Sequence, residues 1–491
     1  MRKHNQNILF EKNVPCSMLI DINHKRVNIL NMAKKLSSFQ RNSRKLNRSI
    51  IKKEHQALNI TKRMINRRRY SRFIRILGPG VVTGAADDDP SGIATYSQAG
   101  AAYGFGFLWA LPFMYPMLLA VQESCSRIGA VTGKGLAAVI KNNYSKKLLY
   151  MSVFLVVIAN TVNIGADLGA MAATTQLFFD VPFALLAIMY AVIIILLVVF
   201  VNYKKYVKIL KWLAISLFAY PITAFLVGQD WGDVFRHTFA TMPQINAETI
   251  YLLVGMIGTT ISPYLFFWDT SEVVEEEISK HRLTGNGNDP KISKRFLRGV
   301  RMDNFVGMTL ATVTAWFIVI ACASVLFKNG ITEINTAADA AKALEPLVQG
   351  FPNAGLIAKL IFSVGIVGVG LLAVPVLAGS SSYAISEMFG WKEGLYRKFK
   401  KAIGFYVVII AATGIGLLIN FLGIDPIQAL VFTAVFNSVA SVPLLWMLVR
   451  VGNNADIMGE YKNKILSNIF VRIAAIVVTI AVITLFYFMI F

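Results

Sequence analysis

Residues 84–95 read Gly-Ala-Ala-Asp-Asp-Asp-Pro-Ser-Gly-Ile-Ala-Thr, and this stretch decides the fold. Three acids and a proline lie inside an otherwise apolar segment, although each central Asp costs about 2.5–3.5 kcal/mol on membrane-insertion scales. Acidic residues in such segments usually face a cavity or a partner and mark a substrate path. Pro90 removes a backbone donor and disfavours helix at Asp89, and Gly92 adds conformational freedom. We predict a broken helix whose freed carbonyls point into the protein interior.

A second interruption follows at residues 258–264, which read Gly-Thr-Thr-Ile-Ser-Pro-Tyr. Pro263 again divides an apolar segment beside hydroxyl-bearing residues. The two interrupted segments are the first and the sixth along the chain. Transporters built from five-plus-five inverted repeats carry unwound helices at these positions, near the bilayer midplane. A pair of ordinary proline kinks would leave the acidic cluster beside the first break unexplained.

The composition agrees with a membrane protein. Hydrophobic residues make up 55% of the 491 residues and charged residues 15%, against about 25% charged in soluble domains. A bilayer-spanning helix needs roughly 20 apolar residues. We predict eleven spans, at 76–103, 106–129, 148–175, 182–202, 206–228, 249–277, 299–327, 354–378, 402–422, 426–450 and 465–490. The predicted fold is an all-α membrane protein of the LeuT type (APC superfamily), a 5+5 inverted repeat with broken helices 1 and 6 plus an eleventh helix.

The loop charges predict the orientation. Every even-numbered span is followed by a basic loop, and the loops on the other side are short or acidic. The positive-inside rule then places the N-terminus in the cytoplasm and the C-terminus outside. We expect an integral protein of the cell membrane, with the lipid bilayer as its surroundings.

Residues 1–75 form a separate, strongly basic tail. They contain 20 Lys and Arg and three acids, which gives +17 of the chain's net +22. We interpret the tail as a solvated cytoplasmic extension, with binding to anionic lipid as the alternative; a nucleic-acid partner is not expected. The ten-helix core is predicted at 76–450, with repeat one at about 76–228 and repeat two at about 249–450, and 451–491 supply a loop and the eleventh helix.

The two breaks together predict a site made of oxygen atoms. Its candidates are the Asp89 carboxylate, the hydroxyls of Ser91, Thr259 and Ser262, and unwound carbonyls. None of the five histidines lies in a predicted span. Hard oxygen ligands suit Mg²⁺, Ca²⁺ or Mn²⁺, and Mg²⁺ in particular keeps several waters and is held through one or two carboxylates. The metal would be the substrate, and no cofactor is expected.

At these breaks the sequence resembles the Nramp family of divalent metal transporters. The stretch Asp-Pro-Ser-Gly at 89–92 is similar to the family's D-P-G-N helix, and residues 259–264 are similar to its A-x-x-M-P-H helix. Asp167-Leu168 resembles the family's D-L-A-E, and residues 378–382 resemble a small-residue stretch found there. The resemblance covers most of 76–450. It implies a LeuT-type fold with metal bound between spans 1 and 6.

The departures from the family pattern concern the ligands and the proton path. Asp89 matches the family's metal-binding Asp, and Thr259 matches the position that gives a backbone carbonyl. Four family residues are replaced: the metal-binding Asn by Gly92, the Met by Ser262, the proton-linked His by Tyr264 and the Glu of span 3 by Ala170. This pattern resembles the Nramp-related magnesium transporter branch, in which hydrated Mg²⁺ moves without strong proton coupling.

Other polar residues keep two interpretations each. Asp87 and Asp88 either attract cations or form a solvated helix end. Glu123 acts as a gate or cation relay, or pairs with Arg127 one turn away. Asp167 and Tyr264 are further pathway candidates. For Asp167 the alternatives are a structural hydrogen bond or a pair with a basic residue near the outer path.

Two polar features lie in the second repeat. The acidic run at 269–277 is predicted to be a solvated face, with attraction of cations at an inner vestibule as the alternative. Asn437 in span 10 is interpreted as an interhelical hydrogen-bonding residue or as a contact of the hydrated ion.

Three functional hypotheses follow. The first is a secondary transporter or facilitator of Mg²⁺, with Mn²⁺ as a further substrate, working as a monomer by alternating access without strong proton coupling. The second is a proton-coupled Mn²⁺/Fe²⁺ importer of the standard Nramp type, which the missing Met, His and Glu disfavour. The third is an amino-acid transporter of the same fold, whose substrate carboxylate the aspartates at the break would repel. No feature indicates an enzyme.

Overall fold

The computed structural model describes residues 84, 86–201, 217–240, 243–280, 282–283 and 292–491, together with Met32, Lys34 and Lys35. The chain divides into two units, Met1–Arg75 and Ile76–Phe491. The three described residues of the first unit are helical and exposed. The rest of the predicted basic tail, the start of predicted span 1 and the first part of predicted span 5 lie outside the described residues.

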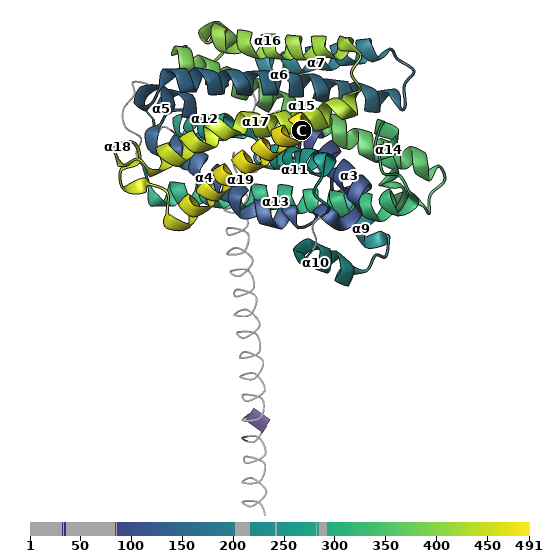
Figure 1. Ribbon diagram of the computed structural model, residues 1–491. Helices are drawn as coiled ribbons and strands as arrows, with labels where there is room; N and C mark the ends of the chain where they lie inside the picture. The colour runs from purple at the N-terminus through teal and green to yellow at the C-terminus, as the bar shows by residue number, and fades with distance from the viewer. Residues whose placement is uncertain are drawn as a thin grey trace, which may run out of the picture. The chain divides into compact units, whose positions relative to one another are not determined.

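The second unit is built of helices and short connections wherever it is described (Figure 1). Its α-helices are α3 (Pro90–Tyr103), α4 (Ala110–Thr132), α5 (Leu136–Asn143), α6 (Lys146–Gln176), α7 (Phe183–Phe200), α9 (Ala219–Leu226), α10 (Trp231–Ala240), α11 (Ala247–Thr260), α12 (Pro263–Ser279), α13 (Lys294–Val325), α14 (Ala337–Lys342), α15 (Ala354–Phe389), α16 (Ile403–Ile419), α17 (Pro426–Asn453), α18 (Ala455–Met458) and α19 (Ile465–Ile490). The 3₁₀ turns are η1 (Gly104–Phe107), η3 (Phe327–Asn329), η4 (Glu345–Val348), η5 (Phe399–Lys401), η6 (Asn420–Leu422) and η7 (Gly459–Tyr461).

Eight helices in the described ranges are long and apolar enough to cross a membrane, or up to nine if the bent pair α3–α4 counts as one span. The eight coincide with predicted spans 3, 4 and 6 to 11, and the sixth comprises α11 and α12 together. Segments 90–107 and 110–132 meet at 112°, so predicted spans 1 and 2 run in different directions. Where predicted span 5 is described, from residue 217 onward, it contains α9. The total of eleven spans remains a prediction.

Glycines allow the broken helices to approach their neighbours closely. A Cβ added at Gly258 of α11 would lie 2.0 Å from the Ala434 carbonyl oxygen of α17. A Cβ at Gly100 of α3 would lie 2.4 Å from the Val319 carbonyl oxygen of α13. Because only glycine fits such contacts, α11 packs directly on α17, and α3 on α13.

A second group of helices surrounds α6. This long helix packs against α7, α15, α16 and α17. In Figure 1, α6, α7 and α16 run side by side along one edge of the unit, and α12, α15 and α17 cross its middle. The breaks of α3 and α11–α12 are therefore enclosed between neighbouring helices.

Candidate functional site

The first break lies at the Asp residues, as predicted. Asp87 is still helical, Asp88 forms a bend, and Asp89 is extended with φ −65° and ψ 170°. Helix α3 then begins at Pro90, a residue that suits the first helical position because its missing N–H would have no partner there. Asp89 is the N-cap, and its Oδ1 accepts a hydrogen bond from the Gly92 amide at 2.8 Å. The prediction of a broken first helix is confirmed.

The Asp89 carboxylate is buried, with 1% of the residue exposed, and has three donors. Its Oδ1 also accepts from the Ser91 hydroxyl at 2.6 Å. Its Oδ2 accepts from the Asn163 side-chain amide of α6 at 2.8 Å. The side-chain oxygen of Asn163, Oδ1, in turn accepts from the Thr433 hydroxyl of α17 at 2.8 Å. The Asp89 carboxylate is thus bound to α6 directly and to α17 through Asn163.

Sequence reasoning missed Asn163 and Thr433. A signal for Asn163 was present, since an amide in an apolar span four residues before Asp167 shares a helix face with it. Thr433 gave no such signal, because threonine is common in membrane helices and its partner is 270 residues away.

The second break is also confirmed. Helix α11 ends at Thr260, Ile261 has φ −111° and ψ 62°, and α12 begins at Pro263. The Ser262 hydroxyl donates to the Thr259 carbonyl at 2.7 Å and to the Gly258 carbonyl at 3.1 Å. Since a hydroxyl donates one proton and keeps two lone pairs, the Ser262 oxygen remains able to face a cation.

The two breaks lie against each other. A Cβ added at Gly92 would be 2.9 Å from Thr259 Oγ1 and 3.5 Å from Asp89 Oδ1. The Tyr96 and Thr260 hydroxyls are 2.9 Å apart, and the Tyr264 hydroxyl donates to the Ala86 carbonyl at 3.1 Å. The threonine side chain therefore fills the space that a longer residue at position 92 would need. Tyr264 joins the helix before the first break to α12.

Several buried oxygens around these helices have no hydrogen-bond partner among the described residues. They belong to Asp87, Asp167, Thr259 and Asn437. Asp87 and Asp88 are only 4% and 5% exposed, so the interpretation of a solvated helix end is wrong for them. Asn437 lies one turn beyond Thr433 on α17, near the Ala434 carbonyl that approaches Gly258. The structure thus brings Asp89, Ser91, Gly92 and Thr259 together, and places Asn437 on the helix that packs against α11.

Carboxylates alone do not make a metal cage here. In the part of the chain that the structure describes, no group of three or more His, Cys, Asp or Glu side chains is arranged to hold a metal ion. A cation at Asp89 would therefore have at most two such side chains as ligands and would otherwise depend on neutral oxygens. The Met171 thioether and Pro90 both lie beside Gly370 of α15, since a Cβ added at Gly370 would be 2.6 Å from Met171 Sδ and 3.6 Å from Pro90 Cγ.

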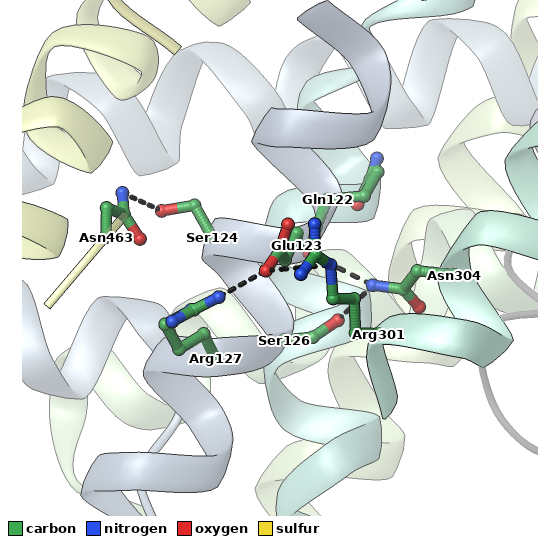
Figure 2. A network of polar contacts seen from close by, with 8 residues as sticks. All are labelled: Gln122, Glu123, Ser124, Ser126, Arg127, Arg301, Asn304 and Asn463. Atoms are coloured by element: carbon green, nitrogen blue, oxygen red, sulfur yellow. Dashed lines mark hydrogen bonds and ion pairs between the residues drawn. The ribbon is translucent and has the colours of Figure 1, made fainter. Parts of the chain in front are cut away.

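Glu123 is the centre of a polar network between α4 and α13 (Figure 2). Arg127 donates to it from the next turn of α4, as predicted, and Arg301 of α13 lies 3.5 Å away. Close to it, Ser126 and Asn304 hydrogen-bond each other, and both donate to Asp269 of α12. This network joins the three helices α4, α12 and α13.

The acidic run at 269–277 is not a solvated face, and that prediction is wrong. Asp269 and Glu277 are fully buried, and none of the five acids in the run is exposed. Glu275 accepts a hydrogen bond from Tyr383 of α15, and Glu276 pairs with Lys280. Asp269 and Glu275 have partners on other helices, and the charge pattern of α12 alone does not contain that information.

A cavity of about 770 Å³ opens between the ends of four helices. Its lining includes Tyr103 of α3, Glu248 of α11, Gln428 of α17 and Met489 of α19. Gln98 of α3 binds the neighbouring loop through the Thr332 carbonyl at 3.1 Å and the Ile334 amide at 3.0 Å. Asp89 does not line this cavity, so the site is closed toward it.

The sequence is similar to known transporters. A family model described as natural resistance-associated macrophage protein-like, or Nramp, matches residues 80–488. The chain is 26% identical over 450 residues to the divalent metal cation transporter MntH of Clostridium acetobutylicum, covering 88% of this chain and 95% of the relative. It is 25% identical over 408 residues to the MntH of Caldanaerobacter subterraneus subsp. tengcongensis, covering 81% and 89%.

The fold is similar to solved transporters. A manganese transporter of Eremococcus coleocola superposes with a TM-score of 0.65 at 17% identity, covering 84% of this chain and 86% of that chain. MhsT, solved with L-phenylalanine, gives a TM-score of 0.54 at 11% identity, covering 83% and 98%.

The described helices, with two interrupted helices beside a buried carboxylate, have the fold of these neighbours, which is the LeuT type. The predicted fold class is confirmed. The chain belongs to the Nramp family, because the family model matches 80–488. Its relatives are transporters, which confirms the prediction that the chain is not an enzyme.

Proposed function

We propose that this protein transports divalent metal cations, with Mg²⁺ as the preferred substrate and Mn²⁺ as a further one. The observation that carries this proposal is the buried Asp89 carboxylate at the junction of two broken helices, with the hydroxyls of Ser91, Thr259 and Ser262 close by. Mg²⁺ keeps several waters and needs only one or two carboxylates, so this donor set suits a largely hydrated ion. The names of the MntH relatives support a divalent cation as substrate.

The proton path expected of a coupled importer lacks its usual groups here. Tyr264 and Ala170 stand where the family pattern has a His and a Glu. Tyr264 has a packing role, since its hydroxyl donates to the Ala86 carbonyl and its own carbonyl accepts from Ser380 at 2.6 Å. We therefore propose a facilitator driven by the ion gradient and membrane potential, without strong proton coupling. This assignment corresponds to the magnesium branch of the family.

Alternating access would move predicted spans 1, 2, 6 and 7, which contain α3, α4, α11–α12 and α13, as a bundle against the other helices. The Glu123 pairs drawn in Figure 2 support this division, because they link α4 to α13. The hydrogen bonds from Ser126 and Asn304 to Asp269 link both helices to α12. The ends of α3, α11, α17 and α19 that line the large cavity would face outside, with the N-terminus in the cytoplasm and the C-terminus outside. We propose a monomer in the cell membrane.

Ion selectivity tests the proposal. The full chain is reconstituted into proteoliposomes, and uptake of Mg²⁺, Mn²⁺, Ca²⁺ and Cd²⁺ is measured separately. Saturable Mg²⁺ uptake is expected, with weaker transport of Cd²⁺ because hard oxygen ligands disfavour a soft ion. Transport of Mn²⁺ and Cd²⁺ with no Mg²⁺ uptake would overturn the magnesium assignment.

A second candidate is a Mn²⁺ transporter that uses a soft ligand. Its support is the sulfur of Met171, which lies with Pro90 beside Gly370, together with the manganese transporter of similar fold. Met171→Leu separates the two candidates, because a participating thioether would make Mn²⁺ and Cd²⁺ uptake fall while Mg²⁺ uptake stays constant. For the magnesium proposal, all three ions keep their wild-type ratio in Met171→Leu.

A further inference from the structure

The Asp89 carboxylate is satisfied by protein donors alone. Its two oxygens accept from the Gly92 amide, the Ser91 hydroxyl and the Asn163 amide, at 2.6–2.8 Å. A buried carboxylate without partners is costly, and donors that face it remove much of that cost. The first two donors belong to the same turn as Asp89 and move with it. Asn163 is different, because it comes from α6.

Asn163 is itself held in position. It is fully buried, and its side-chain oxygen Oδ1 accepts from the Thr433 hydroxyl at 2.8 Å. The same hydroxyl also lies 2.8 Å from the Leu430 backbone carbonyl, so the two oxygens share its proton. With its oxygen engaged by Thr433, the amide group presents its N–H to Asp89 Oδ2. The result is a chain of hydrogen bonds from α17 through α6 to the break before α3.

We propose that Asn163 is a positioning residue that takes the place of the cation at Asp89 after release, so that the unloaded transporter can reorient. This inference rests on the proposed function. A facilitator completes its cycle by returning without substrate, and a bare carboxylate facing α6 would oppose that step in a low dielectric. A neutral amide suits the role, since it satisfies Oδ2 without the charge that would exclude a divalent cation.

The same geometry explains why the ion can displace the amide. A divalent cation interacts with a carboxylate far more strongly than a neutral N–H does. Only Oδ2 has to exchange its partner, while the Ser91 and Gly92 donors keep Oδ1 oriented. Asn163 therefore acts on the return of the unloaded carrier more than on ion binding.

The test compares net uptake with exchange. In proteoliposomes, net Mg²⁺ uptake into empty vesicles requires the unloaded carrier to return, whereas exchange of isotopically labelled Mg²⁺ against internal Mg²⁺ does not. For Asn163→Ala, net uptake is expected to fall by about tenfold or more, the effect of losing a hydrogen bond to a charged group, while exchange stays within about twofold. Thr433→Val removes the hydroxyl that holds the Asn163 side chain. It should lower the ratio of net uptake to exchange by a smaller factor.

The matched control is Asn160→Ala on the same helix. Asn160 is also a fully buried asparagine, but its amide donates to the Leu377 carbonyl and Ser381 hydroxyl of α15, so the ratio should remain at the wild-type value. The inference would be overturned if the ratio of net uptake to exchange kept its wild-type value in both Asn163→Ala and Thr433→Val, whether the two rates fell together or did not change. If Asn163→Ala fails to fold, Thr433→Val decides alone. Absence of any divalent transport by the wild type would instead contradict the proposed function.

Discussion

Asp89 combines two roles that a single substitution can separate. Its Oδ1 caps α3 through the Gly92 amide, and its charge provides the only carboxylate joined to both Ser91 and Asn163 among the described residues. Asn and Asp are nearly equivalent as N-caps, whereas Ala costs about 1 kcal/mol at such a position. An Asn at this position keeps the cap and removes the charge.

Asp89→Asn should therefore fold normally and lose transport. We expect Mg²⁺ uptake to fall by at least about 100-fold, since even partners of metal ligands contribute about 10–100-fold to affinity. The midpoint of thermal unfolding in detergent should stay close to that of the wild type, and Asp89→Ala should lower it. Unimpaired uptake by Asp89→Asn would remove this carboxylate from the site.

Gly92 stands where the family pattern has a metal-binding Asn, and the structure gives a physical reason for this replacement. The Thr259 hydroxyl occupies the position next to the Cβ that glycine lacks. A ligand side chain at position 92 would thus have to displace Thr259. The sequence shows the replacement. Its physical reason depends on Gly92 and Thr259, which are 167 residues apart in the sequence and lie against each other at the two breaks.

At the scale of helices, the network around Glu123 links α4 to α13. Both Glu123 and Arg127 side chains are close to buried, at 10% and 13% exposure. Glu123→Gln removes the negative charge that pairs with Arg127, and we expect the free energy of unfolding to fall by about 1–3 kcal/mol. Thermal unfolding in detergent measures the loss.

Lys280→Gln is the control for that variant. Lys280 and Glu276 form a pair with the same four-residue spacing, but the lysine side chain is 48% exposed. Exposed pairs contribute about 0–1 kcal/mol, so the midpoint should hardly change. Equal destabilisation by the two substitutions would show that burial does not decide the strength of the Glu123 pair.

The connection between α15 and α16 contains a carboxyl group with a displaced pKa. Burial, with the negative charges of Glu387 and Glu275, raises the pKa of Glu393 from 4.5 to about 9, and Arg397 opposes the shift. The folded chain therefore binds more protons than the unfolded chain between these two values. Stability should fall as the pH rises through that window.

Glu393→Gln should flatten this pH dependence. Unfolding midpoints of the wild type are expected to decrease from pH 5.5 to pH 8.5 more steeply than those of the variant. Substitution of the exposed neighbour, Lys392→Gln, should leave the wild-type slope in place. A slope that Glu393→Gln does not change would mean that this carboxyl is ionised in the folded protein across the window.

The sequence was sufficient to predict both helix breaks, because Pro90 and Pro263 act locally on the backbone. It was not sufficient for Asn163, whose role depends on the approach of α6 to α3. The prediction that the acidic run of α12 is a solvated face was wrong for a related reason. A row of charges indicates a solvated face only if no neighbouring helix offers partners, and Ser126, Asn304 and Tyr383 do so here.

At the scale of the whole molecule, the site is closed toward the large cavity, and transport requires the helices that enclose it to move. The energy source for an uncoupled divalent cation is its own charge. Two charges moving inward gain about 4.6 kcal/mol per 100 mV of inside-negative potential. A facilitator with this site needs no proton to accumulate Mg²⁺.

Mg²⁺ uptake into proteoliposomes containing a pH indicator, at an imposed membrane potential, tests this claim most directly. We predict saturable uptake that accelerates when the interior is made negative, with no change of internal pH beyond that of protein-free vesicles. Uptake of Mn²⁺ without Mg²⁺, accompanied by internal acidification, would contradict it and identify a proton-coupled importer.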